Sequence, residues 1–336
     1  MRNIVILLLF AAMAYSGHAR QWSTDILGAP FQQTTVNLPG DYAGDPVCTV
    51  VRARSHGAQR AVLYIHGYND YFFQKPMAMQ FIRHGYSFYA VDLRRYGRSL
   101  RPADKPFDIR DISAYSAEID SAISIIKDNG INEIVMLGHS TGGLIAATYL
   151  SRYHPSEVKA LILNSPFLDW NLGSTEKFVP AIAAIGRLLP SLNIPQSRST
   201  AYAESLFKSA HGEWTFDTDW KHPVSLPVTA GWIHAIDKAQ RDLREIEYPV
   251  KVPVLLMMSE RSISGDTWNP DFNKADAVLD VNDIALYGRR LSDNVRAIAF
   301  RGGLHDLALS SCPVRCQYYS SIFNWLGTIM PDASKK

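Results

Sequence analysis

One eleven-residue stretch constrains the fold more than any other part of the 336-residue chain. Residues 134–144 read Ile-Val-Met-Leu-Gly-His-Ser-Thr-Gly-Gly-Leu, which is an apolar run, a serine between glycines, and the beginning of a helix-like segment. Gly138 and Gly142 are small enough to let the backbone turn sharply on both sides of Ser140. The stretch therefore predicts a buried strand that passes through a tight turn into a helix and lifts the Ser140 hydroxyl out of the sheet.

Short apolar and β-branched runs alternate with segments of helical spacing over most of the chain. The predicted strands are 48–52, 61–65, 87–91, 133–137, 160–163, 252–257 and 296–300, and the clearest helical spacing covers 112–127, 143–153 and 317–326. Several of these runs lack polar alternation, as strands covered on both faces do. The pattern predicts an α/β fold with a mostly parallel, doubly wound sheet.

The alternation lapses between residues 167 and 248, where prolines and aromatic residues collect. We interpret this part as an inserted, mainly helical cap between two parts of one core, 20–166 and 249–336. The apolar stretch 178–189 is a predicted helix, either facing a substrate cleft or packing inside the cap.

The N-terminus has the layout of a secretory signal peptide. Met1-Arg2-Asn3 precedes an apolar run from Ile4 to Tyr15 that is short for a membrane span, and the small Ala19 marks a cleavage point. We expect residues 1–19 to be removed and the protein to be periplasmic or extracellular, without stable membrane insertion afterwards. An uncleaved anchor is the alternative.

Export makes disulfide bonds chemically permissible. Cys312 and Cys316, with Pro313 between them, either form a local loop staple or remain free thiols. Cys48 lies in an apolar run and is expected to be a small buried residue.

Charge and metal-ligand spacing exclude some classes of protein. The formal net charge is +2, with acids and bases mixed along the chain, so there is no basic stripe for nucleic acid. The cysteines have no accompanying residues at metal-ligand spacing. The expected partner is a small acyl substrate, and no metal or organic cofactor is expected.

Two backbone N–H groups are candidates for stabilising an oxyanion near Ser140. Thr141 begins the predicted helix, so its N–H points toward the serine. The second candidate is Tyr68, because residues 63–70 end an earlier predicted strand with His66-Gly67. His66 precedes the serine and is expected to shape this loop and not to act as a base.

These motifs together resemble the α/β-hydrolase superfamily. They are His66-Gly67, the run 92–99 (Asp-Leu-Arg-Arg-Tyr-Gly-Arg-Ser) and 138–142 (Gly-His-Ser-Thr-Gly). The nearest likeness is to the serine aminopeptidase and monoacylglycerol lipase-like branch, which includes lysophospholipase-like enzymes. The resemblance implies that an acid and then a histidine follow the serine. His305, in the glycine loop 300–307 (Phe-Arg-Gly-Gly-Leu-His-Asp-Leu), takes the place of the family's base.

The acid is harder to assign, because the compact Gly-x-x-Asp loop of the family does not follow residues 254–259. Residues 275–281 (Ala-Asp-Ala-Val-Leu-Asp-Val) resemble that loop displaced by an insertion. We expect Asp276 to be the acid. Asp280 is the next candidate, followed by Glu260 and Asp266.

The resemblance implies a serine hydrolase that works through Ser140, His305, Asp276 and an acyl-enzyme. With the export signal and the aromatic, apolar cap, we expect an exported carboxylesterase or lipase-like enzyme. An aminopeptidase of the same fold is an alternative. It needs an acidic group in the cap to hold the substrate amine, for which Glu176, Glu204 and Glu213 are available. A non-catalytic binding protein is a further alternative.

Overall fold

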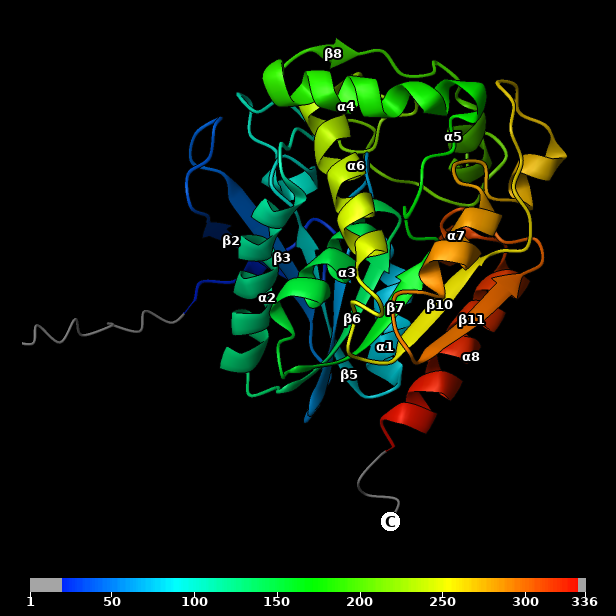
Figure 1. The fold of residues 1–336 in the computed structure, drawn as a ribbon. Helices are drawn as coiled ribbons and strands as arrows, with labels where there is room; N and C mark the ends of the chain where they lie inside the picture. Colours follow the sequence, from blue (N-terminus) through cyan, green and yellow to red (C-terminus); the bar gives the residue numbers. More distant parts are fainter. Residues whose placement is uncertain (1–19, 332–336) are drawn as a thin grey trace, which may run out of the picture.

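The computed structural model describes residues 20–331 of the protein (Figure 1). The predicted signal peptide, residues 1–19, lies outside the described residues, so its interpretation stays a prediction. Within residues 20–331, no helix is both long enough and apolar enough to cross a membrane.

A nine-stranded sheet runs through the centre of the molecule in the order β1-β2-β3-β5-β4-β6-β7-β10-β11. Its strands are β1 (Ser23–Thr24), β2 (Gln32–Asn37), β3 (Val47–Ala53), β4 (Arg60–Ile65), β5 (Tyr86–Asp92), β6 (Glu133–His139), β7 (Val158–Asn164), β10 (Val254–Ser259) and β11 (Val295–Phe300). From β5 to β11 all neighbours are parallel, whereas β1, β2 and β3 pair antiparallel at one edge. The predicted mostly parallel α/β sheet is confirmed.

The central strands are mostly apolar because both faces of the sheet are covered. In β4, Leu63 packs into a hydrophobic cluster on one face, while Val62 and Tyr64 pack into a separate cluster on the other. This division follows the pleat, which points successive side chains to opposite faces. All seven residues of β5 are buried for the same reason.

Helices cover the two faces in two groups. The helices α1 (Lys75–Arg83) and α8 (Cys312–Ile329) contribute Phe81 and Ile322 to one cluster, and α2 (Ser116–Asp128) and α3 (Thr141–Tyr153) contribute Ile119 and Leu144 to the other. The core also contains α7 (Val281–Gly288), and the short 3-10 turns are η1 (Gly97–Ser99), η2 (Ile112–Tyr115), η4 (Pro270–Asn273) and η5 (Leu307–Leu309). The predicted helices 112–127, 143–153 and 317–326 correspond to η2 with α2, to α3 and to α8.

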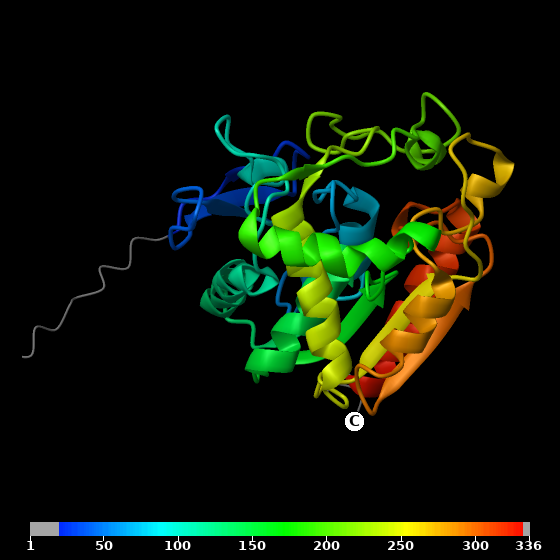
Figure 2. The same ribbon diagram turned by 45° about the horizontal axis from the view of Figure 1, so that its top comes forward.

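Residues 165–253, here called the β7–β10 segment, contain the irregular part of the sequence. They form η3 (Gly173–Phe178), α4 (Val179–Leu188), β8 (Asn193–Ile194), α5 (Ala201–Leu206), β9 (Val228–Thr229) and α6 (Ala230–Glu245). α4 crosses α6 on the outside of the molecule (Figure 2). The crossing requires Gly186, since a Cβ there would lie 2.0 Å from the carbonyl oxygen of Ala230. The predicted helix 178–189 is α4.

The cysteines do not form a loop staple. Cys312 and Cys316 are exposed free thiols on the first two turns of α8, because Pro313 starts the helix and does not bend a loop. Cys48 is buried in β3 as expected.

Candidate active site

Ser140 occupies a strained turn between β6 and α3. Its backbone angles are φ 52° and ψ −121°, a conformation that L-residues adopt only when the surroundings enforce it. The enforcing contacts are tight: a Cβ on Gly142 would lie 2.3 Å from the carbonyl oxygen of Ile65, and one on Gly138 would lie 2.6 Å from that of Gly142. The sequence pattern of glycines therefore corresponds to a real steric requirement.

The loop that follows β4 passes directly against this turn. A Cβ on Gly67 would lie 3.0 Å from the Cβ of Ser140, so a larger residue there would push the two segments apart by a few tenths of an ångström. Tyr68, Ser140 and Thr141 line one cavity. Thr141 is the first residue of α3, where helix geometry leaves the backbone N–H without an intrahelical acceptor. Both predicted oxyanion donors thus belong to segments that meet at Ser140.

His66 has the supporting position expected of it. The ring is fully buried, with Nδ1 2.8 Å from the carbonyl oxygen of Gly67 and Nε2 3.1 Å from the backbone N of Leu93. Because Leu93 donates to Nε2, the proton is on Nδ1 and the ring ties the loop to the end of β5.

His305 and Asp276 are in direct contact. Nδ1 of His305 lies 2.8 Å from Oδ2 of Asp276, which is fully buried. The other carboxylate oxygen accepts hydrogen bonds from the backbone N–H groups of Val278 and Leu279, each at 2.8 Å. The carboxylate therefore holds the imidazole proton on Nδ1 and leaves Nε2 able to accept a proton.

The insertion after β10 folds back to bring Asp276 to this position. The backbone N–H of Asp276 donates to the carbonyl oxygen of Arg261 at 2.9 Å, and that of Ile263 donates to the Asp276 carbonyl oxygen at 2.8 Å. The intervening residues, including η4, loop outward. Asp276 consequently lies beside the end of β10 although the sequence separates the two.

The other acid candidates lie elsewhere. Asp280 caps α7 by accepting a hydrogen bond from the backbone N–H of Asn282 at 2.8 Å. Glu260 and Asp266 are exposed. Among the four acids considered from the sequence, the structure brings only Asp276 to His305.

The cavity around Ser140 has a volume of about 280 Å³. His305 contributes to its wall together with large rings, which include Phe167, Trp170, Phe216 and Trp232. No hydrogen bond joins the Ser140 hydroxyl to His305 within the described chain, as is common before substrate binds. The cavity wall thus combines large apolar rings with polar side chains, among them the serine and the imidazole.

A buried polar layer connects the serine turn to the histidine loop. The carbonyl oxygen of Asn164 accepts the backbone N–H of Ser140 at 3.0 Å, and its side-chain Nδ2 donates to Oδ1 of Asp306 at 2.7 Å. The Asn164 side-chain oxygen accepts the backbone N–H of Leu307 at 3.2 Å. A single asparagine at the end of β7 therefore sets the relative position of the two loops.

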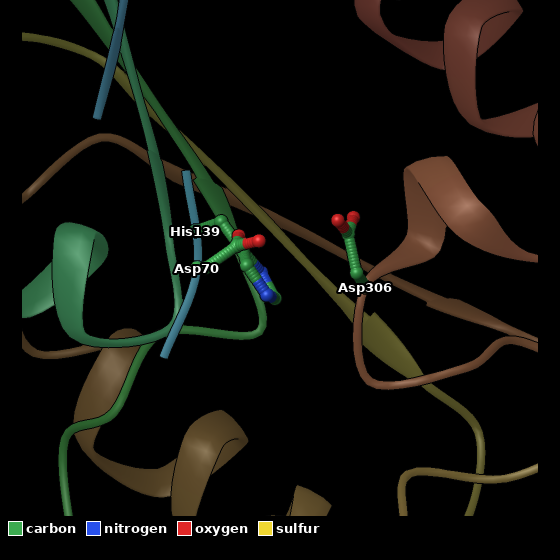
Figure 3. A group of neighbouring side chains, drawn as sticks. All are labelled: Asp70, His139 and Asp306. Carbon is green, nitrogen blue, oxygen red and sulfur yellow. The ribbon is translucent and has the colours of Figure 1, made fainter. Parts of the chain in front are cut away.

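Asp70, His139 and Asp306 come from three separate segments of the chain and lie near one another (Figure 3). Their nearest donor atoms lie within 4.8 Å of one another, a spacing that a metal ion can bridge. Each carboxylate already has protein partners, however: the Lys221 ammonium lies 2.9 Å from Asp70, and Asp306 accepts from side-chain and backbone N–H groups. Burial lowers the pKa of His139, so its ring is neutral. We assign no metal to the group.

The β7–β10 segment is bound to the loop after β4 by a row of polar contacts, none of which the sequence indicated. They are Tyr68 Oη to Leu226 O (3.2 Å), Asn69 Nδ2 to His222 O (2.8 Å), His222 N to Asn69 Oδ1 (2.8 Å), Lys221 Nζ to Asp70 Oδ1 (2.9 Å) and Asp217 N to Tyr71 Oη (2.8 Å). The partners are about 150 residues apart in the chain, and no local pattern signals such pairs.

One family model matches more than half of the chain, and curated relatives resemble part of it. Residues 56–267 match the family model described as "Serine aminopeptidase, S33". A monoacylglycerol lipase of Mycolicibacterium smegmatis is 30% identical over 135 residues, which are 40% of this chain and 47% of that protein. The AB hydrolase superfamily protein YisY of Bacillus subtilis is 32% identical over 111 residues, 32% of this chain and 38% of that protein. The chain spans less than half the length of these curated relatives.

Solved structures agree on the fold. A soluble variant of monoglyceride lipase from Saccharomyces cerevisiae, in complex with a substrate analog, superimposes with a TM-score of 0.64 at 16% identity, over 89% of this chain and 97% of that one. A thermostable carboxyl esterase from Bacillus coagulans gives 0.64 at 13% identity, over 89% and 98%. The family resemblance inferred from the sequence motifs is confirmed. The chain belongs to the serine aminopeptidase S33 family of α/β hydrolases.

Proposed function

We propose that the protein is a serine hydrolase that cleaves carboxylic esters, with Ser140 as nucleophile, His305 as base and Asp276 as the acid that orients the base. The observation that carries the proposal is the 2.8 Å contact of Asp276 with His305, whose ring shares a cavity with the strained Ser140 turn. Nucleophile, base and orienting acid at one site are the arrangement that acyl transfer requires.

The proposed reaction has two halves. Nε2 of His305 takes the proton of the Ser140 hydroxyl as the oxygen attacks the ester carbonyl, and the backbone N–H groups of Tyr68 and Thr141 stabilise the resulting oxyanion. His305 then protonates the leaving alcohol, which departs and leaves an acyl-serine. Water loses a proton to His305 and attacks the acyl carbon, and His305 then returns the proton to the Ser140 oxygen as the acid is released.

The chemistry of the cavity wall favours an ester over a peptide with a free N-terminus. An aminopeptidase needs a carboxylate near the substrate amine, but the described residues that line the cavity include no aspartate or glutamate. The sequence candidates are engaged or directed elsewhere: Glu204 accepts the Thr200 hydroxyl at 2.5 Å, Glu213 pairs with Arg315 at 2.7 Å, and Glu176 lies outside the lining.

The volume of the cavity limits the length of acyl chain that it can hold. About 280 Å³ lies at the lower end of the roughly 300–1,000 Å³ typical of small-molecule sites. The apolar and aromatic wall suits a hydrocarbon chain, and the names of the relatives, monoacylglycerol lipase among them, support an acylated small alcohol as substrate. We therefore propose short to medium acyl chains.

The test is hydrolysis of p-nitrophenyl esters of increasing acyl length by the protein and by its Ser140→Ala variant. Serine-dependent turnover with an optimum at short to medium chains supports the proposal. Turnover that survives in Ser140→Ala contradicts the assignment of the nucleophile. A folded protein inactive on every ester favours the peptidase or the non-catalytic binding protein, which an aminoacyl amide series then separates.

Export is also part of the proposal. It rests on the basic start, the apolar run and the small residue at Ala19 in the sequence. N-terminal sequencing of the protein recovered from a cell fractionation tests it: a mature chain beginning at Arg20 outside the cytoplasm supports export, and an intact Met1 in the cytoplasm contradicts it.

A further inference from the structure

Lys221 is a buried, charged residue in the lining of the active-site cavity. It is the only lysine, arginine, aspartate or glutamate among the described residues that line the cavity. The residue is 8% exposed, so its ammonium is almost removed from bulk water. A cation in such a place is costly unless it is fully paired.

The pairing of Lys221 within the protein is incomplete. An ammonium group carries three N–H donors, and in the described part of the chain Lys221 donates only to Oδ1 of Asp70, at 2.9 Å. Two aromatic rings also lie near the ammonium, with Nζ 6.0 Å from the ring centroid of Phe73 and 5.8 Å from that of Phe216. These rings attract a cation weakly and offer no hydrogen-bond acceptor.

The contact with Asp70 also explains how the ammonium is held in place. Asp70 is buried in the loop after β4, and Lys221 reaches it from the β7–β10 segment, next to the reciprocal hydrogen bonds of Asn69 and His222. A tether between the two segments needs one donor of the ammonium. Lys221 is also a lining residue of the cavity, and two donors of its ammonium have no hydrogen-bond acceptor within the described part of the chain, so they are left for a substrate group.

We propose that the cavity selects an ester that carries an anionic group, a carboxylate or a phosphate, and that Lys221 binds this group while Ser140 attacks the ester carbonyl. The inference rests on the proposed function and narrows its substrate class. Hydrogen bonds between ions in a water-poor site are stronger than neutral ones. The anion is either on the acyl side or on the alcohol side of the ester.

Two matched pairs of esters show whether the anionic group belongs to the acyl part or to the alcohol part of the substrate. On the acyl side, mono-p-nitrophenyl glutarate is compared with the p-nitrophenyl ester of monomethyl glutarate; on the alcohol side, monobutyrylglycerol phosphate is compared with monobutyrylglycerol. We expect kcat/KM to be about tenfold to a hundredfold higher for the anionic member of one pair, from the strength of a hydrogen bond to a charged group.

Variants assign the preference to Lys221. Each protein is scored by its ratio of anionic to neutral kcat/KM, so that a smaller folded fraction cancels. Lys221→Met should abolish the preference for the anionic ester. The double variant Lys221→Met with Asp70→Asn, which also removes the carboxylate left unpaired, should abolish it as well. Lys221→Arg should retain much of the preference. The control is Lys238→Met, which removes a cation from α6, outside the cavity lining, and should leave the ratio unchanged.

Two results overturn the inference: a wild-type ratio of one or less in both pairs, or a preference that survives in Lys221→Met. Failure of the proposed function is recognised separately, because then neither member of any pair is hydrolysed. If no ester is hydrolysed, binding of butyl phosphate is measured by calorimetric titration. The inference requires butyl phosphate to bind the wild type at least about tenfold more tightly than Lys221→Met. Equal binding to the two proteins refutes the inference.

Discussion

Replacing Asp276 by asparagine exchanges one carboxylate oxygen for an NH₂ group and keeps the shape of the side chain. The backbone N–H groups of Val278 and Leu279 point at Oδ1, so the amide oxygen must take that position. The amide NH₂ is then forced to face Nδ1 of His305, where Oδ2 lies 2.8 Å away in the native protein. His305 must therefore accept at Nδ1 and carry its proton on Nε2.

In that tautomer His305 cannot take the proton of Ser140. The same exchange in a well-studied serine protease lowers kcat about ten-thousandfold, which corresponds to about 5.4 kcal/mol of transition-state stabilisation. Because the Asp276 contacts enforce the same inversion, we expect a loss of about this size in kcat. KM should change little, since Asp276 lies behind the imidazole and does not line the cavity.

The assay is steady-state hydrolysis of the best p-nitrophenyl ester, with circular dichroism to confirm folding. Asp280→Asn is the matched control, because asparagine caps a helix about as well as aspartate does and the α7 cap is preserved. A folded Asp276→Asn variant with kcat within tenfold of the wild type would falsify the tautomer argument. A selective loss in Asp280→Asn would move the acid to that residue.

Three further outcomes follow from the packing and the buried groups. Gly142→Ala should unfold the protein or lower its free energy of unfolding by several kcal/mol in urea titration, because the new Cβ would lie 2.3 Å from a carbonyl oxygen. The control is Gly327→Ala, whose new Cβ has no atom within 4 Å and which should leave the free energy of unfolding unchanged or raise it. Asn69→Ala should cost about 1–3 kcal/mol in the same titration through two lost hydrogen bonds to the β7–β10 segment, and an unchanged midpoint would contradict their role. Burial lowers the pKa of His139, so the unfolded chain takes up a proton below about pH 6.5 that the folded chain does not, and stability should fall as pH drops from 7.5 to 5.5. His139→Asn should lose less stability over this range, and an equal loss would refute the assignment.

The sequence alone predicted the layout of the fold and two candidate site residues, Ser140 and His305. Continuous apolar runs predict strands buried on both faces, and β4 to β7 and β10 lie where those runs are. β11 also lies at a predicted position, but at the edge of the sheet most of its residues are partly or fully exposed. The glycines around Ser140 predict a strained turn because only small residues permit the backbone approach that the structure has. These features depend on neighbours in the chain, so the local sequence carries them.

Helix α6 and strand β2 were not predicted from the sequence pattern. α6 has a polar, charged outer face and follows a proline-rich stretch, and β2 lies at an antiparallel edge and exposes part of its length. Such elements are stabilised by packing against parts of the core that are distant in sequence, which no local period reveals.

Only the tertiary structure shows which of the four acids contacts His305. The sequence favoured Asp276 by resemblance, but the contact with His305 depends on the insertion after β10 folding back through backbone hydrogen bonds to Arg261 and Ile263. The pairing of Lys221 with Asp70 is likewise a product of the fold, since it joins residues 151 positions apart. Local sequence determines what each segment can form, and only the folded chain determines which side chains share one cavity.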